Sequence, residues 1–269
     1  MFKRIIIILL SVVICCSCGA DKEKQQAQFR LQTAREMYAA DRFNSAKLQI
    51  DSIHLLYPRQ VELRRQAVLL ADSIDLREAE RTMVYSDSLL QLLQPQADQL
   101  LRTFRHEKDA RYEDHGGYIH QLLVTTRNIN RCMLQAVVGD DVSLTVKSYY
   151  FGKKQLQHST LTLTSDELQT QATATPHCFR IDDYYEILSL SEQQSCSILQ
   201  LVSAKKDKRI KVTLSGKSDY TYYLQENEKD ALEQTYRLFV LMRDIKRLEE
   251  NLNKASKIIE LKSKKLTNK

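Results

Sequence analysis

The chain has 269 residues, with 40 lysines and arginines, 34 aspartates and glutamates, and a formal net charge of +6. This positive excess is too small to indicate a protein that binds nucleic acid. Hydrophobic residues make up 43% of the chain, enough for the core of one or two domains, whereas six glycines and three prolines favour long helices over a loop-rich enzyme.

Residues 1–17 have the pattern of a secretory signal peptide. Lys3 and Arg4 form a positive start, an apolar run follows over residues 5–14, and the chain becomes polar at Asp21. A helix that spans a bilayer needs roughly 20 apolar residues. This segment reaches that length only if its charged and cysteine residues are counted, so a permanent transmembrane helix is the less favoured interpretation.

Three cysteines, Cys15, Cys16 and Cys18, lie where the apolar run ends. This cluster resembles the lipobox of bacterial lipoproteins, in which a signal peptidase cuts just before a cysteine that carries diacylglycerol. A small residue precedes the modified cysteine in that family, and Ser17 before Cys18 fits best. The usual leucine three positions upstream is here Cys15. The resemblance implies that Cys18 is the lipid attachment site.

The same resemblance implies a location and an anchor. A mature lipoprotein of this kind carries three acyl chains, and each buried methylene adds about 0.8 kcal/mol, so the membrane attachment would be effectively permanent. Gly19, and not aspartate, follows Cys18, which implies delivery to the outer membrane, on its periplasmic face or at the cell surface. The alternative is an ordinary cleaved signal with incidental cysteines.

Residues 18–58 are predicted to form a helical hairpin that closes at Pro58. Within residues 30–58, Ala34, Phe43, Ala46 and Pro58 resemble a tetratricopeptide repeat, with small residues where two helices cross closely. At least three repeats are normally needed for a continuous core, so we expect one or two hairpins packed on another element. The hairpin and the lipid anchor together, about 60 residues, are similar to the helical-repeat lipoprotein of the outer-membrane barrel assembly machine.

Residues 59–115 read as one long helix, or two end to end, covering about 60–112. Pro95 lies inside its apolar seam, and proline lacks a backbone donor and clashes with the preceding turn. We therefore expect a kink or break near Gln94. The seam alternates by four and three residues, as in a coiled coil, through Ala79, Met83, Ser86, Leu90, Leu93, Ala97, Leu100 and Phe104.

Residues 226–269 carry a second seam, in a helix expected at about 226–266. We expect the two helices to pair antiparallel within the chain as a long stalk. An apolar seam does not determine which helix packs against it. Parallel pairing between two chains is therefore the alternative, and it would make a homodimer. The second seam consists of Leu238, Leu241, Ile245, Leu248, Leu252, Ala255 and Ile259.

Residues 116–225 change to an alternation of apolar and polar residues with a period of two, which is typical of strands. The clearest runs are 142–150, 159–164 and 209–216, with turn signals at Gly139, Gly152 and Gly216. We expect about seven to nine short antiparallel strands that form a sandwich or an open barrel. The predicted fold class is α+β, with this β domain inserted between the stalk helices.

The sequence lacks the common catalytic signatures, including GxGxxG, GxSxG, the Walker loop, HExxH and the EF-hand loop. His115 and His120 have the residue type of metal ligands. A glycine pair that leads into the sheet explains the same stretch without a metal, so we expect no metal site and no cofactor.

Cys132, Cys178 and Cys196 lie beyond the lipid cysteine. An oxidising compartment would permit one disulfide, for which Cys178 and Cys196 are the nearer pair. Three buried free thiols are the alternative. His177 stands beside Cys178, but neighbours on a strand point to opposite faces and cannot serve each other as base and nucleophile.

Asp182, Asp183 and Glu186 form an acidic cluster. A glycosidase needs two carboxyl groups roughly 5 to 10 Å apart across a cleft. Nearness in sequence provides no cleft, so we expect the three residues on an exposed turn and without a catalytic role.

These patterns predict a lipid-anchored cell-envelope protein, not an enzyme, that acts as a binding or scaffold module with a protein partner. The first alternative is an accessory subunit of an outer-membrane assembly or transport complex that docks through the hairpin. The second is an envelope hydrolase, for which the sequence offers least support.

Overall fold

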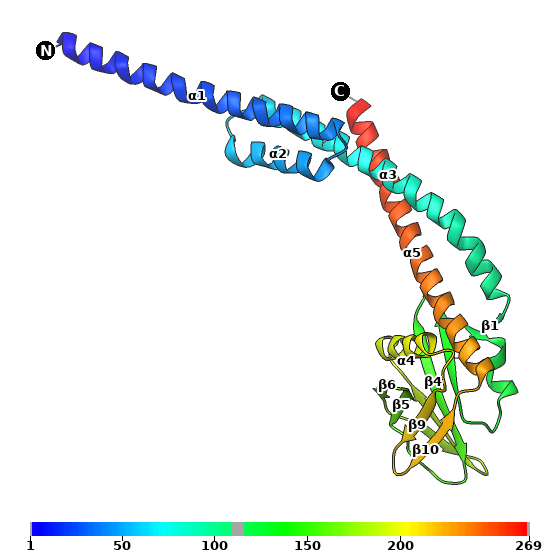
Figure 1. Ribbon diagram of the computed structural model, residues 1–269. Coiled ribbons are helices and arrows are strands. Elements are labelled where there is room, and N and C mark those ends of the chain that lie inside the picture. The colour runs from blue at the N-terminus through cyan, green and yellow to red at the C-terminus, as the bar shows by residue number, and fades with distance from the viewer. Residues whose placement is uncertain (1, 109–115, 268–269) are drawn as a thin grey trace. The chain divides into compact units, whose positions relative to one another are not determined.

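The computed structural model describes residues 2–108 and 116–267, with side chains from residue 21 onward. The side chain of Cys18 and the whole of His115 therefore lie outside the described residues. The α+β fold class is confirmed, because long helices accompany two antiparallel sheets (Figure 1). The chain divides into two compact units, one of residues 1–88 and 249–269 and one of residues 89–248.

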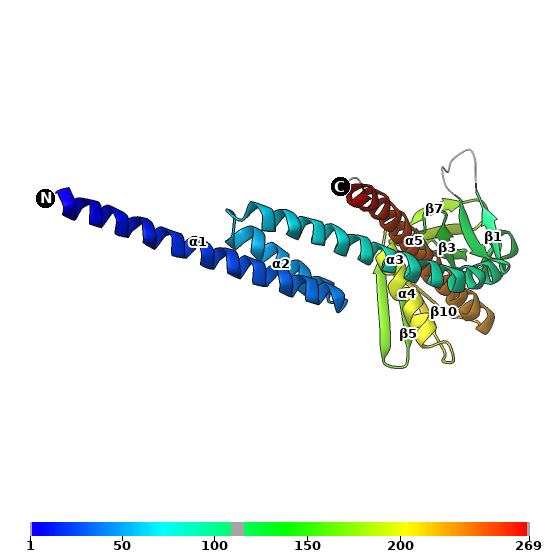
Figure 2. The same cartoon turned by 90° about the horizontal axis from the view of Figure 1, so that it is seen from above.

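The first unit contains the predicted hairpin. Helix α1 (Phe2–Ala39) continues from the apolar start of the chain without a break, and α2 (Phe43–Leu56) lies beside it (Figures 1 and 2). The two helices approach closely because Ala34 and Ala46 are fully buried between them. The hairpin packs on the first part of α3 (Val61–Leu101) through Phe43, Ile50, Ile53, Ala67 and Ile74.

An ionic cluster joins the helices of this unit. The buried carboxylate of Asp72 on α3 lies 2.7 Å from Lys262 Nζ and 2.5 Å from Lys265 Nζ, both near the end of α5 (Glu226–Thr267). Asp75 Oδ2 is also 2.7 Å from Lys262, and its Oδ1 is 2.9 Å from Lys47 on α2. Burial raises the pKa of Asp72, but the hydrogen bonds and charges of Lys262 and Lys265 together lower it below its ordinary value.

The second unit begins with the last part of α3, which pairs antiparallel with the first part of α5. Ala97 is buried against Leu241 and Ile245, and Leu90, Leu93 and Leu100 pack around them. Of the kink or break predicted near Gln94, the break is wrong, because α3 runs through Pro95 to Leu101. Apolar contacts on both sides of the proline compensate for the lost backbone hydrogen bond. The predicted helical span to residue 112 is also wrong, since a strand starts at Phe104.

The strands of this unit form two antiparallel sheets, with ten strands in the part of the chain that is described. The six-stranded sheet has the order β1 (Phe104–Glu107), β2 (Gly117–His120), β3 (Met133–Gly139), β4 (Leu144–Gly152), β8 (Tyr184–Ser189), β7 (His177–Arg180). The four-stranded sheet has the order β10 (Asp219–Tyr223), β9 (Lys211–Ser215), β5 (Thr160–Ser165), β6 (Leu168–Thr173). Short 3₁₀ helices η1 (Gln121–Leu123) and η2 (Thr125–Arg127) precede β3.

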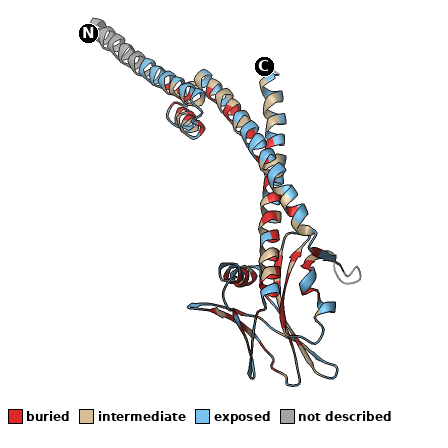
Figure 3. Ribbon diagram, turned by 45° about the vertical axis from the view of Figure 1, so that its right-hand side comes forward, coloured by how far each residue is buried: buried red, intermediate tan, exposed pale blue. Residues whose placement is uncertain are grey.

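The core of the second unit combines residues from both sheets, from α5 and from one helix that the sequence pattern missed. That helix, α4 (Glu192–Ala204), packs on β4 and β6. Figure 3 shows buried residues along the first half of α5, beside the strands. The core includes Leu134, Val146 and Leu188 of the larger sheet, Leu163 and Val212 of the smaller sheet, Ile198 of α4 and Phe239 of α5.

Candidate binding site

A row of three aromatic side chains crosses the outer face of the six-stranded sheet. Phe151 on β4 is paired with Tyr185 on β8, which is paired with Phe179 on β7. The rings of Phe179 and Tyr185 are parallel with centroids 5.1 Å apart, and the Phe151 ring lies 5.0 Å from Tyr185 at an angle of 50°. Because paired residues in adjacent strands share a face, the register places the three rings side by side.

A cavity of about 180 Å³ adjoins this aromatic row. The segment after η2 supplies one wall through Ile129 and Arg131, and the sheet supplies the floor through Met133 and Ile187. Ile129 is largely exposed, and Phe179 lies on the edge strand β7, where it is 41% exposed. The site is therefore an apolar pocket, open at the edge of the sheet.

The polar groups around the pocket are mostly bound to one another. Asn128 Nδ2 donates to two backbone carbonyls at 2.9 Å, and the Tyr185 hydroxyl donates to Asn130 Oδ1 at 2.5 Å. The Tyr149 hydroxyl donates to Gln135 Oε1 at 3.1 Å, and Gln135 Nε2 donates to Leu123 O at 2.7 Å. The pocket therefore offers chiefly apolar contact to a ligand.

Glu186 lies behind the aromatic row and stabilises its strand. It follows Tyr185 on β8, so it points to the opposite face, and it is fully buried. Its Oε1 accepts the backbone N–H groups of Leu156 and Gln157, both at 2.7 Å, and its Oε2 accepts the N–H and Nδ1 of His158 at 2.8 and 2.9 Å. This cluster ties β8 to the segment that follows β4.

Burial is the largest single influence on Glu186 and raises its pKa. The four hydrogen bonds from residues 156–158 together outweigh it, so the pKa of Glu186 is below its ordinary value. Gly216 is required nearby, because a Cβ there would lie 2.5 Å from the backbone oxygen of Gln157. Gln157 itself has a φ of 48°, in the left-handed region.

The predicted acidic cluster is therefore not brought together. Asp182 is exposed on the turn between β7 and β8, as expected, and Asp183 is half-buried beside it. The prediction of an exposed turn is wrong for Glu186, because the strand alternation directs its side chain into the core.

The histidines play local roles. His120 Nδ1 accepts the N–H of Leu122 at the start of η1, and its ring packs edge-on against Phe104. Burial lowers the pKa of His120. Within residues 21–108 and 116–267, no group of three or more His, Cys, Asp or Glu side chains is arranged to hold a metal ion.

The three cysteines of the second unit are free thiols. The predicted Cys178–Cys196 disulfide is not formed, because Cys178 lies on edge strand β7 whereas Cys196 lies on α4, which packs on β4 and β6. Burial raises the pKa of each thiol. The thiols are free, as in the second arrangement that the sequence left open, but they are half-buried and not buried as that arrangement supposed.

Lys229 is a buried residue that sequence reasoning missed. It lies in the first turn of α5, and its ammonium donates to Lys206 O at 2.5 Å and Lys208 O at 2.8 Å. It also lies 2.8 Å from the exposed carboxylate of Glu226. This contact fastens the segment after α4, through the carbonyls of Lys206 and Lys208, to the start of α5.

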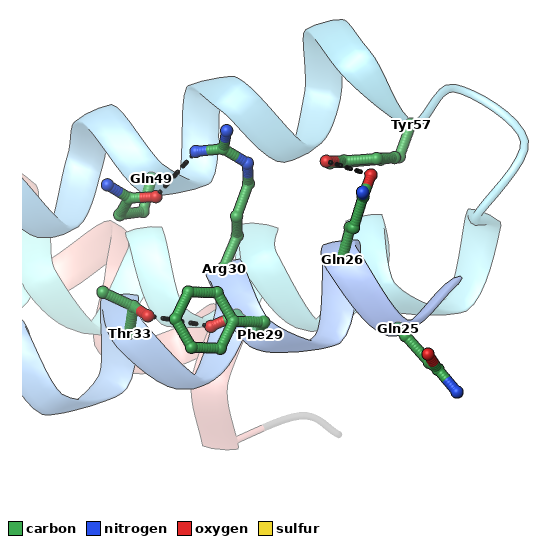
Figure 4. A pocket seen from close by; sticks show the side chains of 7 residues that line it. All are labelled: Gln25, Gln26, Phe29, Arg30, Thr33, Gln49 and Tyr57. Atoms are coloured by element: carbon green, nitrogen blue, oxygen red, sulfur yellow. Dashed lines mark hydrogen bonds between the residues drawn. The ribbon is translucent and has the colours of Figure 1, made fainter. Parts of the chain in front are cut away.

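A second concave surface lies on the hairpin of the first unit. It is a shallow groove of about 600 Å³ between α1 and the end of α2, and Figure 4 shows the side chains that line it. Arg30 Nη1 donates to Gln49 Oε1 at 3.0 Å, and the Tyr57 hydroxyl donates to Gln26 Oε1 at 3.3 Å. Phe29 is exposed beside them.

Comparison of the chain with protein-family models, curated proteins and solved structures gives no match. Among the helices, as far as their side chains are described, none is long and apolar enough to cross a membrane.

Proposed function

We propose that the protein is a lipid-anchored, non-catalytic binding module of the cell envelope, attached to the outer membrane through Cys18. The resemblance of residues 1–18 to a lipoprotein signal supports the anchor. The observation that carries the binding role is the apolar pocket beside the aromatic row Phe151–Tyr185–Phe179. Aromatic side chains that remain exposed beside a pocket are typical of protein contact surfaces.

The chemistry of the pocket supports binding over catalysis. Acid–base catalysis requires a titratable group within hydrogen-bonding reach of the substrate. Glu186 is the carboxylate nearest the aromatic row in sequence, and both of its oxygens are engaged by residues 156–158. The pocket therefore favours a ligand that is held by apolar contact.

The anchor is tested by intact mass analysis of the mature protein and of a Cys18→Ala variant. We expect the wild-type mass to exceed that of the cleaved polypeptide by the lipid groups, and the variant to leave the membrane fraction. An unmodified N-terminus in the wild type would remove the anchor from the proposal.

The binding role is tested by crosslinking in cells with the full-length protein. We expect a discrete crosslinked partner that is lost in Phe179→Ala and retained in Tyr223→Ala. Tyr223 is the matched control, because it is 40% exposed against 41% for Phe179 and also lies on an edge strand, in the other sheet. Equal crosslinking by both variants would contradict the role of the pocket. A hydrolytic activity that is lost in Asp182→Asn would contradict the proposal that the protein is non-catalytic.

A second candidate function is docking to an outer-membrane assembly or transport complex through the hairpin. It is favoured by the groove beside Phe29 and by the exposed leucines of α2, among which Leu55 is 79% exposed. Replacing Leu55 with aspartate should then release the protein from that complex, whereas Leu261→Asp, at a site 68% exposed on α5, should not. Retention of the complex by Leu55→Asp would exclude this function.

A further inference from the structure

We propose that the pocket beside the aromatic row is an anchor site for one phenyl-sized aromatic side chain of a protein partner. This inference rests on the proposed function, since it names the chemistry by which the binding module holds its partner. It follows from the size of the pocket, from the state of its polar groups and from the kind of side chains that line it.

The size of the pocket limits the ligand group to about one ring. Its volume is about 180 Å³, and an engineered apolar cavity of about 150 Å³ in another protein holds one benzene molecule. A long acyl chain has many more carbon atoms than one benzene ring and exceeds a cavity of this size. The pocket therefore accepts a single side chain and excludes the body of a lipid.

The polar groups at the pocket argue against a sugar. A sugar ring carries several hydroxyl groups, and each hydroxyl that is buried without a partner costs free energy. The Asn130 carbonyl is occupied by the Tyr185 hydroxyl, the Asn128 amide donates to the backbone, and the Tyr149 hydroxyl is bound to Gln135. The Arg131 guanidinium is paired with Glu228 at 2.9 Å. An apolar group enters without breaking these bonds.

The lining of the pocket favours an aromatic group. The parallel rings of Phe179 and Tyr185 and the tilted ring of Phe151 offer both stacked and edge-on contact to an incoming ring. The thioether of Met133 in the floor also contacts aromatic rings favourably. A buried aromatic side chain surrounded by apolar contacts is the usual centre of a protein interface.

The inference is tested on the full-length protein in lipid nanodiscs, with isotope-labelled isoleucine and methionine methyl groups followed by NMR. The probes are N-acetyl-phenylalanine amide, N-acetyl-leucine amide and methyl glucoside. We expect the phenylalanine probe to shift the methyl signals of Ile129, Ile187 and Met133 saturably, with a dissociation constant on the order of 1 mM. The leucine probe should bind several-fold more weakly, and the glucoside should leave these signals unchanged.

Two variants form a matched pair for this titration. Ile129 lines the pocket and is 66% exposed, whereas Ile181 follows β7, does not line the pocket and is 74% exposed. Ile129→Asp should weaken binding of the phenylalanine probe at least fivefold, because it places a carboxylate at the mouth of an apolar site. Ile181→Asp should leave the binding unchanged.

Three results would overturn the inference: no methyl shift at ten times the expected dissociation constant, equal binding of the leucine or glucoside probe, or equal loss in both variants. Its failure is distinguishable from failure of the proposed function. If the cellular partner still depends on Phe179 while the phenylalanine probe does not bind, the binding module stands and only the aromatic anchor is refuted.

Discussion

Replacing Glu186 with glutamine should destabilise the second unit strongly, although the two side chains have nearly the same shape. Each carboxylate oxygen accepts two hydrogen bonds from residues 156–158. Glutamine keeps one oxygen and places an amino group where the other was, so two donors lose their acceptor. Each buried unsatisfied donor costs about 1–3 kcal/mol, so we expect a loss of about 2–6 kcal/mol.

This loss is measured by thermal unfolding, followed by the near-ultraviolet circular dichroism of the tyrosines. For a unit of this size, 1 kcal/mol corresponds to roughly 2–4 °C in Tm, so a mid-range loss of about 4 kcal/mol lowers Tm by roughly 8–16 °C. Asp182→Asn is the control, since Asp182 is exposed on the adjacent turn. The reasoning would be refuted if Glu186→Gln lowered Tm no more than the control does.

The stability difference between the wild type and Glu186→Gln should also depend on pH, with a definite sign. The pKa of Glu186 is lowered in the folded chain. Its ionised form therefore contributes stability above the ordinary pKa of glutamate, about 4.3, and this contribution is lost as the pH falls through the folded pKa. Glutamine does not titrate. The difference in Tm between the wild type and Glu186→Gln should therefore be constant from about pH 7 to 5 and should narrow below about pH 4.3.

Three further substitutions test contacts described above, each by urea unfolding. Lys229→Met removes a buried ammonium from two backbone carbonyls and should lower the free energy of unfolding by about 2–4 kcal/mol; an unchanged midpoint would contradict the role of that contact. Gly216→Ala brings a Cβ against the backbone of residue 157 and should cost about 1–3 kcal/mol, whereas a neutral effect would show that this turn can move. Asp72→Asn should weaken the first unit by about 1–2 kcal/mol, because the lysines around it stay partly exposed; the control Glu260→Gln, in an exposed pair with Lys264, should have no measurable effect.

The long helices and the β region were predictable because each has a regular period. The seams of α3 and α5 repeat every three or four residues, and strands such as β4 and β5 alternate in their buried residues. The continuity of α3 through Pro95 was not predictable, because the residues on either side of the proline pack near Leu241 and Ile245, more than a hundred residues further along the chain. A local rule that predicts a break cannot weigh such tertiary contacts.

Helix α4 was missed, although the sequence carries a signal for it. Ser191 and Gln194 form a capping box, in which each side chain accepts the other residue's backbone N–H. The serine-x-x-glutamine spacing before an apolar run could have revealed the helix start. The surrounding strand pattern masked it, because α4 has only 13 residues.

The candidate site could be predicted only in part. Alternation along a strand tells which residues share a face, but not which residue of another strand lies opposite. The row of aromatic rings requires β8 to pair with β4, across the intervening strands β5, β6 and β7, with Tyr185 opposite Phe151. That register depends on the packing of the whole core, so the sequence did not predict the pocket.

The first unit is discontinuous in sequence, and this has a consequence for the order of folding. Its residues 1–88 are synthesised early, whereas residues 249–269 follow only after the entire second unit. Until then, the carboxylate of Asp72 lacks Lys262 and Lys265. The hairpin therefore emerges before the second half of α5, which completes its unit and is made only after the second unit. Premature termination near residue 248 would leave the second unit whole and the first without its closing segment, a defect that proteolysis would detect at the N-terminal end of the chain.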